Sequence, residues 1–174
     1  MESLHSSSIR SLLLPTHDTG LLFPAPHIAR FWKLKLDPAA RTTWYKLLVQ
    51  KVPLQSYLMH IGRASSPNCL LCQQSVEDLH HFWVGCPSKF DSWRQVLRSL
   101  YPDLHFTSSI IMTALSSLQP PSSILDRDRF LTILGSTLNR IWLSHWAFKI
   151  DHRPFSSQAV AKMSIKIARQ ILHR

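Results

Sequence analysis

Apolar residues recur at helical spacing along most of the chain. Between residues 38 and 50, Trp44, Leu47 and Leu48 share one face, which predicts a helix. Further helices are predicted over residues 54–61, 75–85, 88–101, 110–118, 126–150 and 156–173. No long alternation of apolar and polar residues indicates a sheet. The pattern therefore predicts a mostly α fold.

The helix predicted over 126–150 is the longest in the chain. It presents one apolar face, made of Phe130, Leu134, Leu138, Ile141, Trp142, Trp146 and Ile150. Asp126 and Asp128 lie at its start, where the helix dipole favours acidic side chains. His145 falls on the apolar face, and we expect it to be a core or interface histidine rather than a metal ligand.

Several helix ends carry capping signals. Asp37 precedes a proline, which predicts the start of the first helix, and Gly62 predicts the end of the second. Ser75 and Ser88 are each followed three residues later by an aspartate, which predicts capping boxes at the starts of the next two helices. These signals predict short helices joined by tight turns.

Composition adds a strong positive charge. The chain has 174 residues, of which 45% are hydrophobic, so a compact core is expected. It has 20 Lys and Arg against 10 Asp and Glu, a formal net charge of +10. Such a surplus favours a polyanionic partner, and RNA or DNA is the first candidate. The alternatives are an ordinary solvated basic surface, or a fragment whose acidic partner is missing.

The location of the protein can be inferred from two features of the sequence. No apolar run approaches the roughly 18 residues that a membrane span needs, so we expect no membrane partner. Nothing marks the chain as secreted. It has only three cysteines, which are spaced like metal ligands, and such cysteine usage is typical of a reducing compartment. We expect the protein in the nucleus or the cytoplasm.

The three cysteines lie close together in the sequence. Cys69, Cys72 and Cys86 are the only cysteines, and with His81 they form the pattern C-x2-C-x8-H-x4-C. Three thiolates and one imidazole are a usual closed ligand set for structural zinc. The sequence therefore predicts Zn2+ as a structural cofactor. The alternatives are three unrelated buried thiols, or a disulfide, which the odd count disfavours.

Either of two adjacent histidines could complete the set. On the helix predicted over 75–85, His81 lies about one turn before Cys86, whereas His80 points roughly 100° away. We choose His81, with His80 as the fallback. Because four ligands close the coordination sphere, a catalytic zinc with an open position is disfavoured.

These residues carry a family resemblance. The cysteine pair, the run Glu77-x3-His81-Phe82, Cys86-Pro87 and Trp93 resemble the zinc-binding domain downstream of the polymerase in LINE-type (non-LTR) retrotransposon reverse transcriptase proteins. The upstream segments 31–34, 41–48 and 52–54 are similar to the leading helices of that domain. The resemblance covers about residues 31–97 and implies Cys69, Cys72, His81 and Cys86 as metal ligands. It also implies engagement of template RNA or target DNA beside a polymerase domain.

The predicted organisation has four segments. Residues 1–30 contain three prolines and a glycine and are expected to be an irregular leader or linker. Residues 31–101 form the small helical zinc-knuckle module, of the reverse-transcriptase type. Residues 102–123 are a short helix and a linker, and residues 124–174 a C-terminal helical pair that extends the module.

Catalytic motifs are absent from the sequence. The chain has four glycines and no Gly-rich phosphate loop, no Tyr-x-Asp-Asp, no clear acidic cluster and no His-Glu-x-x-His. We therefore expect no enzymatic activity and no small-molecule substrate. The expected function is a structural zinc-binding module that contributes to nucleic-acid binding. The alternatives are a protein–protein interaction scaffold and a non-functional retroelement remnant.

Basic side chains are the candidate nucleic-acid contacts. Because they would bind phosphate, we expect them to supply affinity more than sequence choice. The candidates are Arg41, Lys46, Lys51, Arg63, Arg94, Arg98, Lys162, Lys166 and Arg169. The last three recur at helical spacing and form a basic stripe, for which the alternative is a solvated charged face.

Overall fold

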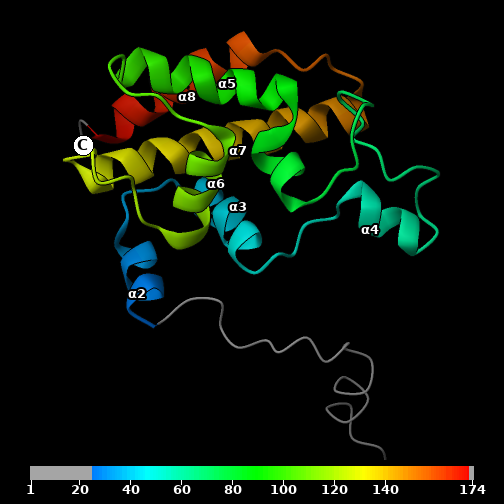
Figure 1. Ribbon diagram of the computed structural model, residues 1–174, viewed down its shortest axis with the longest axis horizontal. Helices are drawn as coiled ribbons and strands as arrows, with labels where there is room; N and C mark the ends of the chain where they lie inside the picture. Colours follow the sequence, from blue (N-terminus) through cyan, green and yellow to red (C-terminus); the bar gives the residue numbers. More distant parts are fainter. Residues whose placement is uncertain (1–24, 173–174) are drawn as a thin grey trace, which may run out of the picture.

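The computed structural model describes residues 25–172, and Figure 1 shows their arrangement. The helices, in chain order, are α2 (Ala25–Lys33), α3 (Pro38–Leu48), α4 (Gln55–His60), η1 (His81–Gly85), α5 (Pro87–Leu100), α6 (Ser108–Ser117), α7 (Arg127–Asp151) and α8 (Ser157–Leu172). Within this part of the chain there is no strand, only an isolated bridge between Asn68 and Val76. The predicted mostly α fold is confirmed.

Helix α7 is the axis of the molecule. In Figure 1 it runs between α5 and α8 on one side and α3 and α6 on the other. Its segment from Phe130 to Leu138 is buried on every side, including the small residues Thr132 and Ser136. A helix that is buried all round must form part of a core rather than cover it.

One hydrophobic core joins the predicted module and the predicted C-terminal pair. It extends from Phe31 through Trp44, Trp83 and Trp93 to Val160. The indole nitrogen of Trp44 donates to the carbonyl of Leu115 at 2.8 Å, which ties α3 to α6. The segment over 102–123 therefore connects parts of one core.

The contact between α3 and α7 depends on a glycine. A Cβ at Gly135 would lie 2.5 Å from Cδ2 of Leu36 and 2.9 Å from Cε3 of Trp44. Both distances are shorter than atoms tolerate, so the indole of Trp44 can lie against the backbone of α7 only because position 135 lacks a side chain. This close approach places α3 on α7.

Three predicted helix ends are confirmed. Asp37 accepts a hydrogen bond from the amide of Ala39 at 2.8 Å, and Asp126 accepts one from the amide of Arg129 at 3.0 Å. Gly62 ends α4 with a φ of +69°, the left-handed region that glycine adopts without strain.

Two predicted caps are wrong. Ser75 lies in the loop, and Asp78 instead caps the next helical turn by accepting from the amide of His81 at 2.7 Å. Helix α5 starts at Pro87, one residue before Ser88, with Cys86 as its N-cap. Proline is favoured in a first helical turn because its missing N–H would have no partner there.

Two further expectations need correction. Residues 25–30 were expected to be irregular, but they belong to α2, whose first turn accommodates Pro26. Residues 1–24 of the expected leader lie outside the described residues. On α7, Ile150 was expected on the buried face but is 68% exposed, because the last turn of the helix extends past the core.

None of the helices in the described part of the chain has the length and apolar content needed to cross a membrane.

Candidate metal centre

A tight loop presents the first two cysteines. Asn68 and Val76 form an antiparallel bridge, and the amide of Cys69 donates to the carbonyl of Ser75 at 2.9 Å. Within the loop the amide of Gln73 returns to the carbonyl of Cys69 at 2.8 Å, and Gln73 has a φ of 57°. This closed turn places the thiols of Cys69 and Cys72 on the same side.

A wide helical turn presents the other two candidate ligands. Residues His81–Gly85 form a π-helix, and the amide of Cys86 donates to the carbonyl of His81 at 3.1 Å, five residues back. A turn of this width places residues five apart on one face, which a normal α-turn would not. His81 and Cys86 therefore face the cysteine loop together.

The four candidate ligand atoms form a compact cluster. The sulfurs of Cys69, Cys72 and Cys86 and a ring nitrogen of His81 all lie within 4.8 Å of one another. Cys69 Sγ is 3.9 Å from Cys86 Sγ, and Cys72 Sγ is 3.3 Å from His81 Nε2. Ligand atoms around a tetrahedral zinc lie roughly 3.5–3.8 Å apart, given Zn–S and Zn–N bonds of about 2.3 and 2.0 Å. The residues present thus fit a zinc ion.

The fallback histidine faces another direction. Nδ1 of His80 would lie 2.7 Å from a Cβ at Gly85, so the His80 ring covers that glycine. His80 is not among the clustered ligand residues. The structure therefore brings His81, and not His80, to the three sulfurs.

The pKa values of Cys86 and His81 are shifted toward the forms that bind metal, whereas the pKa of Cys69 is shifted away from its metal-binding form. The hydrogen bond from the Cys69 thiol lowers the pKa of Cys86 to about 7, and amides at the start of α5 act in the same direction. The same bond, together with burial, raises the pKa of Cys69. Burial lowers the pKa of His81, and the nearby Lys89 ammonium lowers it further. A thiolate and a neutral imidazole are the forms that bind metal.

A buried lysine lies beside the cluster, and the sequence pattern did not predict it. Lys89 is fully buried; its ammonium donates to the carbonyl of Phe82 at 2.6 Å and lies 4.0 Å from the centre of the Phe82 ring. Burial lowers its pKa, while Glu77 and the cysteine sulfurs act in the opposite direction. One signal was available: Lys89 is four residues before Trp93, on the buried face of α5.

Glu77 is a second buried charge near the site. Its Oε1 accepts from the amide of Gln55 at 3.0 Å and so holds the start of α4. Its Oε2 is buried and has no hydrogen-bond partner in the described structure. Three thiolates with a divalent ion would carry one net negative charge. The positive charge of Lys89 would offset this charge, whereas the negative charge of Glu77 would add to it.

The candidate nucleic-acid contacts are spread over the surface. Arg41 donates to the carbonyls of Phe31, Trp32 and Leu34 at 2.7–3.0 Å and so caps the end of α2. Lys46 lies 4.6 Å from the Trp142 ring, and Arg94 pairs with Asp91 at 2.5 Å. The remaining candidates are exposed: Lys51, Arg63, Arg98, Lys162, Lys166 and Arg169.

Comparison with known proteins agrees with this centre. A family described as zinc-binding in reverse transcriptase matches residues 22–93, a range that contains all four candidate ligands. No curated protein and no solved structure gives a significant match. The matched range ends within α5, before α6, α7 and α8 begin. Residues 22–93 of this chain are therefore similar to the zinc-binding domain in reverse transcriptase.

Proposed function

We propose that this protein is a non-catalytic module of a non-LTR retrotransposon reverse transcriptase protein, or a stand-alone fragment of one, that binds RNA or DNA beside the polymerase. The cluster of three sulfurs and one imidazole within 4.8 Å, inside the segment matched by the family, is the observation that carries the proposal. The net charge of +10 supports the nucleic-acid partner.

The proposed role of zinc is structural. Bound by Cys69, Cys72, His81 and Cys86, the ion would supply a closed cross-link between the cysteine loop and the start of α5. Structural zinc contributes on the order of 10 kcal/mol to folding in small finger peptides. Here α3, α5 and α7 also share a large core, so removal of the metal loosens the loop while the core persists.

The charge distribution supports a phosphate-binding surface. Only three ion pairs form among residues 25–172, and they engage Arg30, Arg94 and Arg153. The exposed candidates, including Lys162, Lys166 and Arg98, have no such partner in that range. Unpaired cations are the groups that release counterions on binding a nucleic acid. We assign them to phosphate contacts, and we assign Arg41 to fixing the end of α2.

A salt titration tests the proposal. We expect zinc-loaded protein to bind a labelled RNA or DNA oligonucleotide with an affinity that falls steeply as salt rises. The double substitution Lys162→Gln and Lys166→Gln should weaken binding and reduce the salt slope by about 0.7 for each phosphate that the variant no longer neutralises.

The matched control removes the same charge from another surface. Lys33 and Lys35 are exposed near the end of α2, on the opposite side of α7 from α8 (Figure 1). Lys33→Gln with Lys35→Gln should leave the slope closer to wild type. Binding that does not respond to salt, or no binding at low salt, would refute the proposal.

A second candidate function rests on exposed apolar residues. Tyr57, Met59 and Ile61 on and after α4 are each about half exposed, as is Val76 in the cysteine loop. If these residues form one contiguous apolar patch, that patch is a docking surface for a protein. If this function is correct, Tyr57→Ser with Ile61→Ser abolishes association with a polymerase domain and leaves nucleic-acid binding unchanged.

A further inference from the structure

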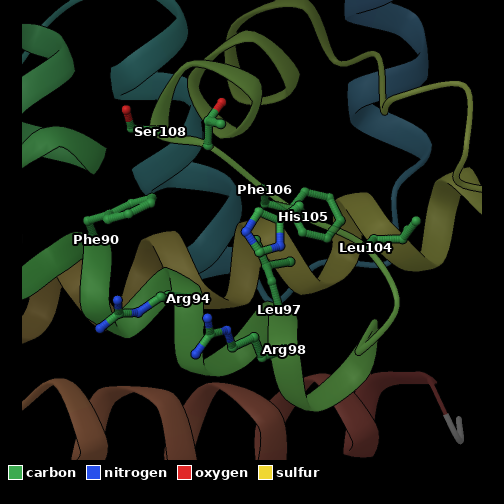
Figure 2. A pocket seen from close by; sticks show the side chains of 9 residues that line it. Phe90, Arg94, Leu97, Arg98, Leu104, His105, Phe106 and Ser108 are labelled. Atoms are coloured by element: carbon green, nitrogen blue, oxygen red, sulfur yellow. The ribbon is translucent and has the colours of Figure 1, made fainter.

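A cavity of about 440 Å³ opens beside α5, where the chain turns into α6. Figure 2 shows Phe90, Arg94 and Arg98 of α5 at this cavity, together with His105 and Phe106 of the segment that leads to α6. Its volume lies within the roughly 300–1,000 Å³ of small-ligand clefts. No metal ligand and no carboxylate lines it, so it is distinct from the zinc centre.

The walls of the cavity are apolar and aromatic. Phe90 is partly exposed and makes no ring–ring contact in the described structure. Phe106 stacks on Phe130 with ring centres 5.6 Å apart, so one of its faces is fixed by the core. Leu97 is buried beneath them. Phe90 and Phe106 lie on opposite sides of the cavity, and the Phe90 ring, which has no aromatic partner, offers a face that suits a flat ring.

The rim of the cavity is cationic. Arg94 and Arg98 are one helical turn apart on α5, and His105 adds a third nitrogen-bearing side chain. Arg94 is held by Asp91, whose pKa the guanidinium keeps below its usual range. Arg98 is exposed and has no ion pair among residues 25–172. Arg98 is therefore the cation that is free to meet an anion.

Together the rim and the walls identify the ligand by its chemistry. A phosphate beside a flat ring is the repeating unit of a nucleic acid, and cations with aromatic faces are the groups that bind it in single strands. In a duplex the bases are stacked on one another and cannot reach a pocket wall. An acidic peptide would meet the cations but leave the phenyl rings unused.

We propose that this pocket binds one phosphate-and-base unit of a single-stranded nucleic acid, with the phosphate at Arg98 and the base against Phe90. The inference rests on the proposed nucleic-acid binding and adds the strand type and the site. Arg98 supplies attraction that depends on salt, and Phe90 supplies contact that depends on the presence of a base. The two contributions are separable by experiment.

The experiment measures fluorescence anisotropy with the full, zinc-loaded chain and three probes: a labelled oligouridylate, an abasic phosphodiester of the same length, and a duplex. Phe90→Leu should weaken binding of the oligouridylate about fivefold or more, the range of base–aromatic stacking. It should leave binding of the abasic probe unchanged. Arg98→Gln should weaken both and lower the salt slope by about 0.7.

Two matched controls remove the same kind of side chain elsewhere. Tyr57→Leu deletes an exposed aromatic ring from α4, and Lys35→Gln deletes an exposed cation near α2. Neither should reproduce the pattern of the pocket variants. Zinc content and circular dichroism establish that each variant is folded. If Phe90→Leu does not fold, Arg98→Gln still tests the pocket.

Each outcome supports or refutes the pocket. If both pocket variants bind the oligouridylate as tightly as wild type while the Lys162 and Lys166 variant does not, the pocket is refuted and the proposed function stands. If the wild-type protein binds no nucleic acid at low salt, both the pocket and the proposed function are refuted. If a polyglutamate peptide displaces the oligouridylate and Phe90→Leu has no effect, the pocket is a general anion site and the base contact is refuted.

Discussion

The ammonium of Lys89 and the carbonyl of Phe82 are 2.6 Å apart in the interior, directly behind the candidate zinc ligands. Phe82 follows His81 in the π-helical turn, and Lys89 lies three residues after Cys86. This single hydrogen bond therefore links the two segments that carry the third and fourth ligands. It also brings a positive charge near three sulfurs.

Replacement of Lys89 by methionine is expected to weaken metal binding. Methionine fills a similar volume but supplies neither the charge nor the donor to Phe82. Removal of groups that support metal ligands typically lowers metal affinity by about 10- to 100-fold. Competition with a chromophoric zinc chelator measures the change. Lys149→Met, at the partly buried lysine near Trp146, is the matched control, and an unchanged affinity in Lys89→Met would contradict the prediction.

The two adjacent histidines are expected to respond differently to substitution. His81→Ala should lose bound zinc, as should Cys86→Ser, because each removes one of four ligand atoms. His80→Ala should retain a stoichiometric ion, since that ring covers Gly85. Elemental analysis of the purified variants gives the metal content. Retention of zinc by His81→Ala together with its loss from His80→Ala would reverse the assignment.

Removal of zinc should loosen the cysteine loop and leave most of the helical content. Trp44 lies on α3, which packs on α7, and Phe130 lies on α7 itself; neither helix carries a candidate metal ligand. Circular dichroism with and without a chelator should show a small change. Protease sensitivity should rise between Pro67 and Asp78, and complete unfolding on chelation would contradict this view.

Acid should destabilise the fold through His145. This side chain is buried against Phe82 and Trp146, and burial lowers its pKa far below the ordinary 6.5, to about 2. The folded state therefore holds it neutral, whereas the unfolded chain takes up a proton below pH 6.5. The contribution of His145 to the free energy of unfolding is complete above pH 6.5. It falls by about 1.4 kcal/mol for each pH unit below that value.

Denaturant titrations at pH 7 and pH 5 check this effect. His145→Phe should reduce the difference in unfolding free energy between the two pH values, because phenylalanine binds no proton. The exposed His105, replaced by glutamine, is the control and should leave the difference unchanged. Equal pH dependence in wild type and His145→Phe would show that His145 is not responsible.

A methyl group at position 135 is expected to separate α3 from α7. In Gly135→Ala the new Cβ would meet Leu36, which can move, and the indole of Trp44, which its bond to Leu115 holds in place. Overpacking of this kind costs about 1–3 kcal/mol. Thermal unfolding measures the loss of stability, with the exposed Ser99→Ala on α5 as the control. Unchanged stability would mean that Trp44 has room to shift.

The helices and the ligand set follow from local features of the sequence. The periodicity around Trp44 and Phe130 depends only on residues within one helix, and a Cys-x2-Cys turn is specified by its own spacing. The mostly α fold could be predicted for that reason. The end of the apolar face of α7 could not, because the exposure of Ile150 depends on where the neighbouring helices stop.

Other features depend on contacts between distant residues. Ser75 has the sequence of a helix cap, but its carbonyl accepts from Cys69, which keeps the segment extended. Arg41 has the sequence context of a surface cation, yet its guanidinium binds carbonyls at the end of a helix that precedes it. Lys89 likewise resembles a surface lysine until Phe82 and the cysteines surround it. Local propensity cannot anticipate a partner supplied by tertiary structure.

The continuity of the core from Phe31 to Val160 has a consequence for inheritance. Residues 22–93 carry the family's signature, but the inner surfaces of α3 and α5 are covered by α7 and α8. A recombination event that transferred the signature alone would expose the buried Trp44 of α3 and Trp93 of α5 to solvent. Such a protein would aggregate. In this chain, transfer of the signature with its core covered therefore requires α7 and α8 as well.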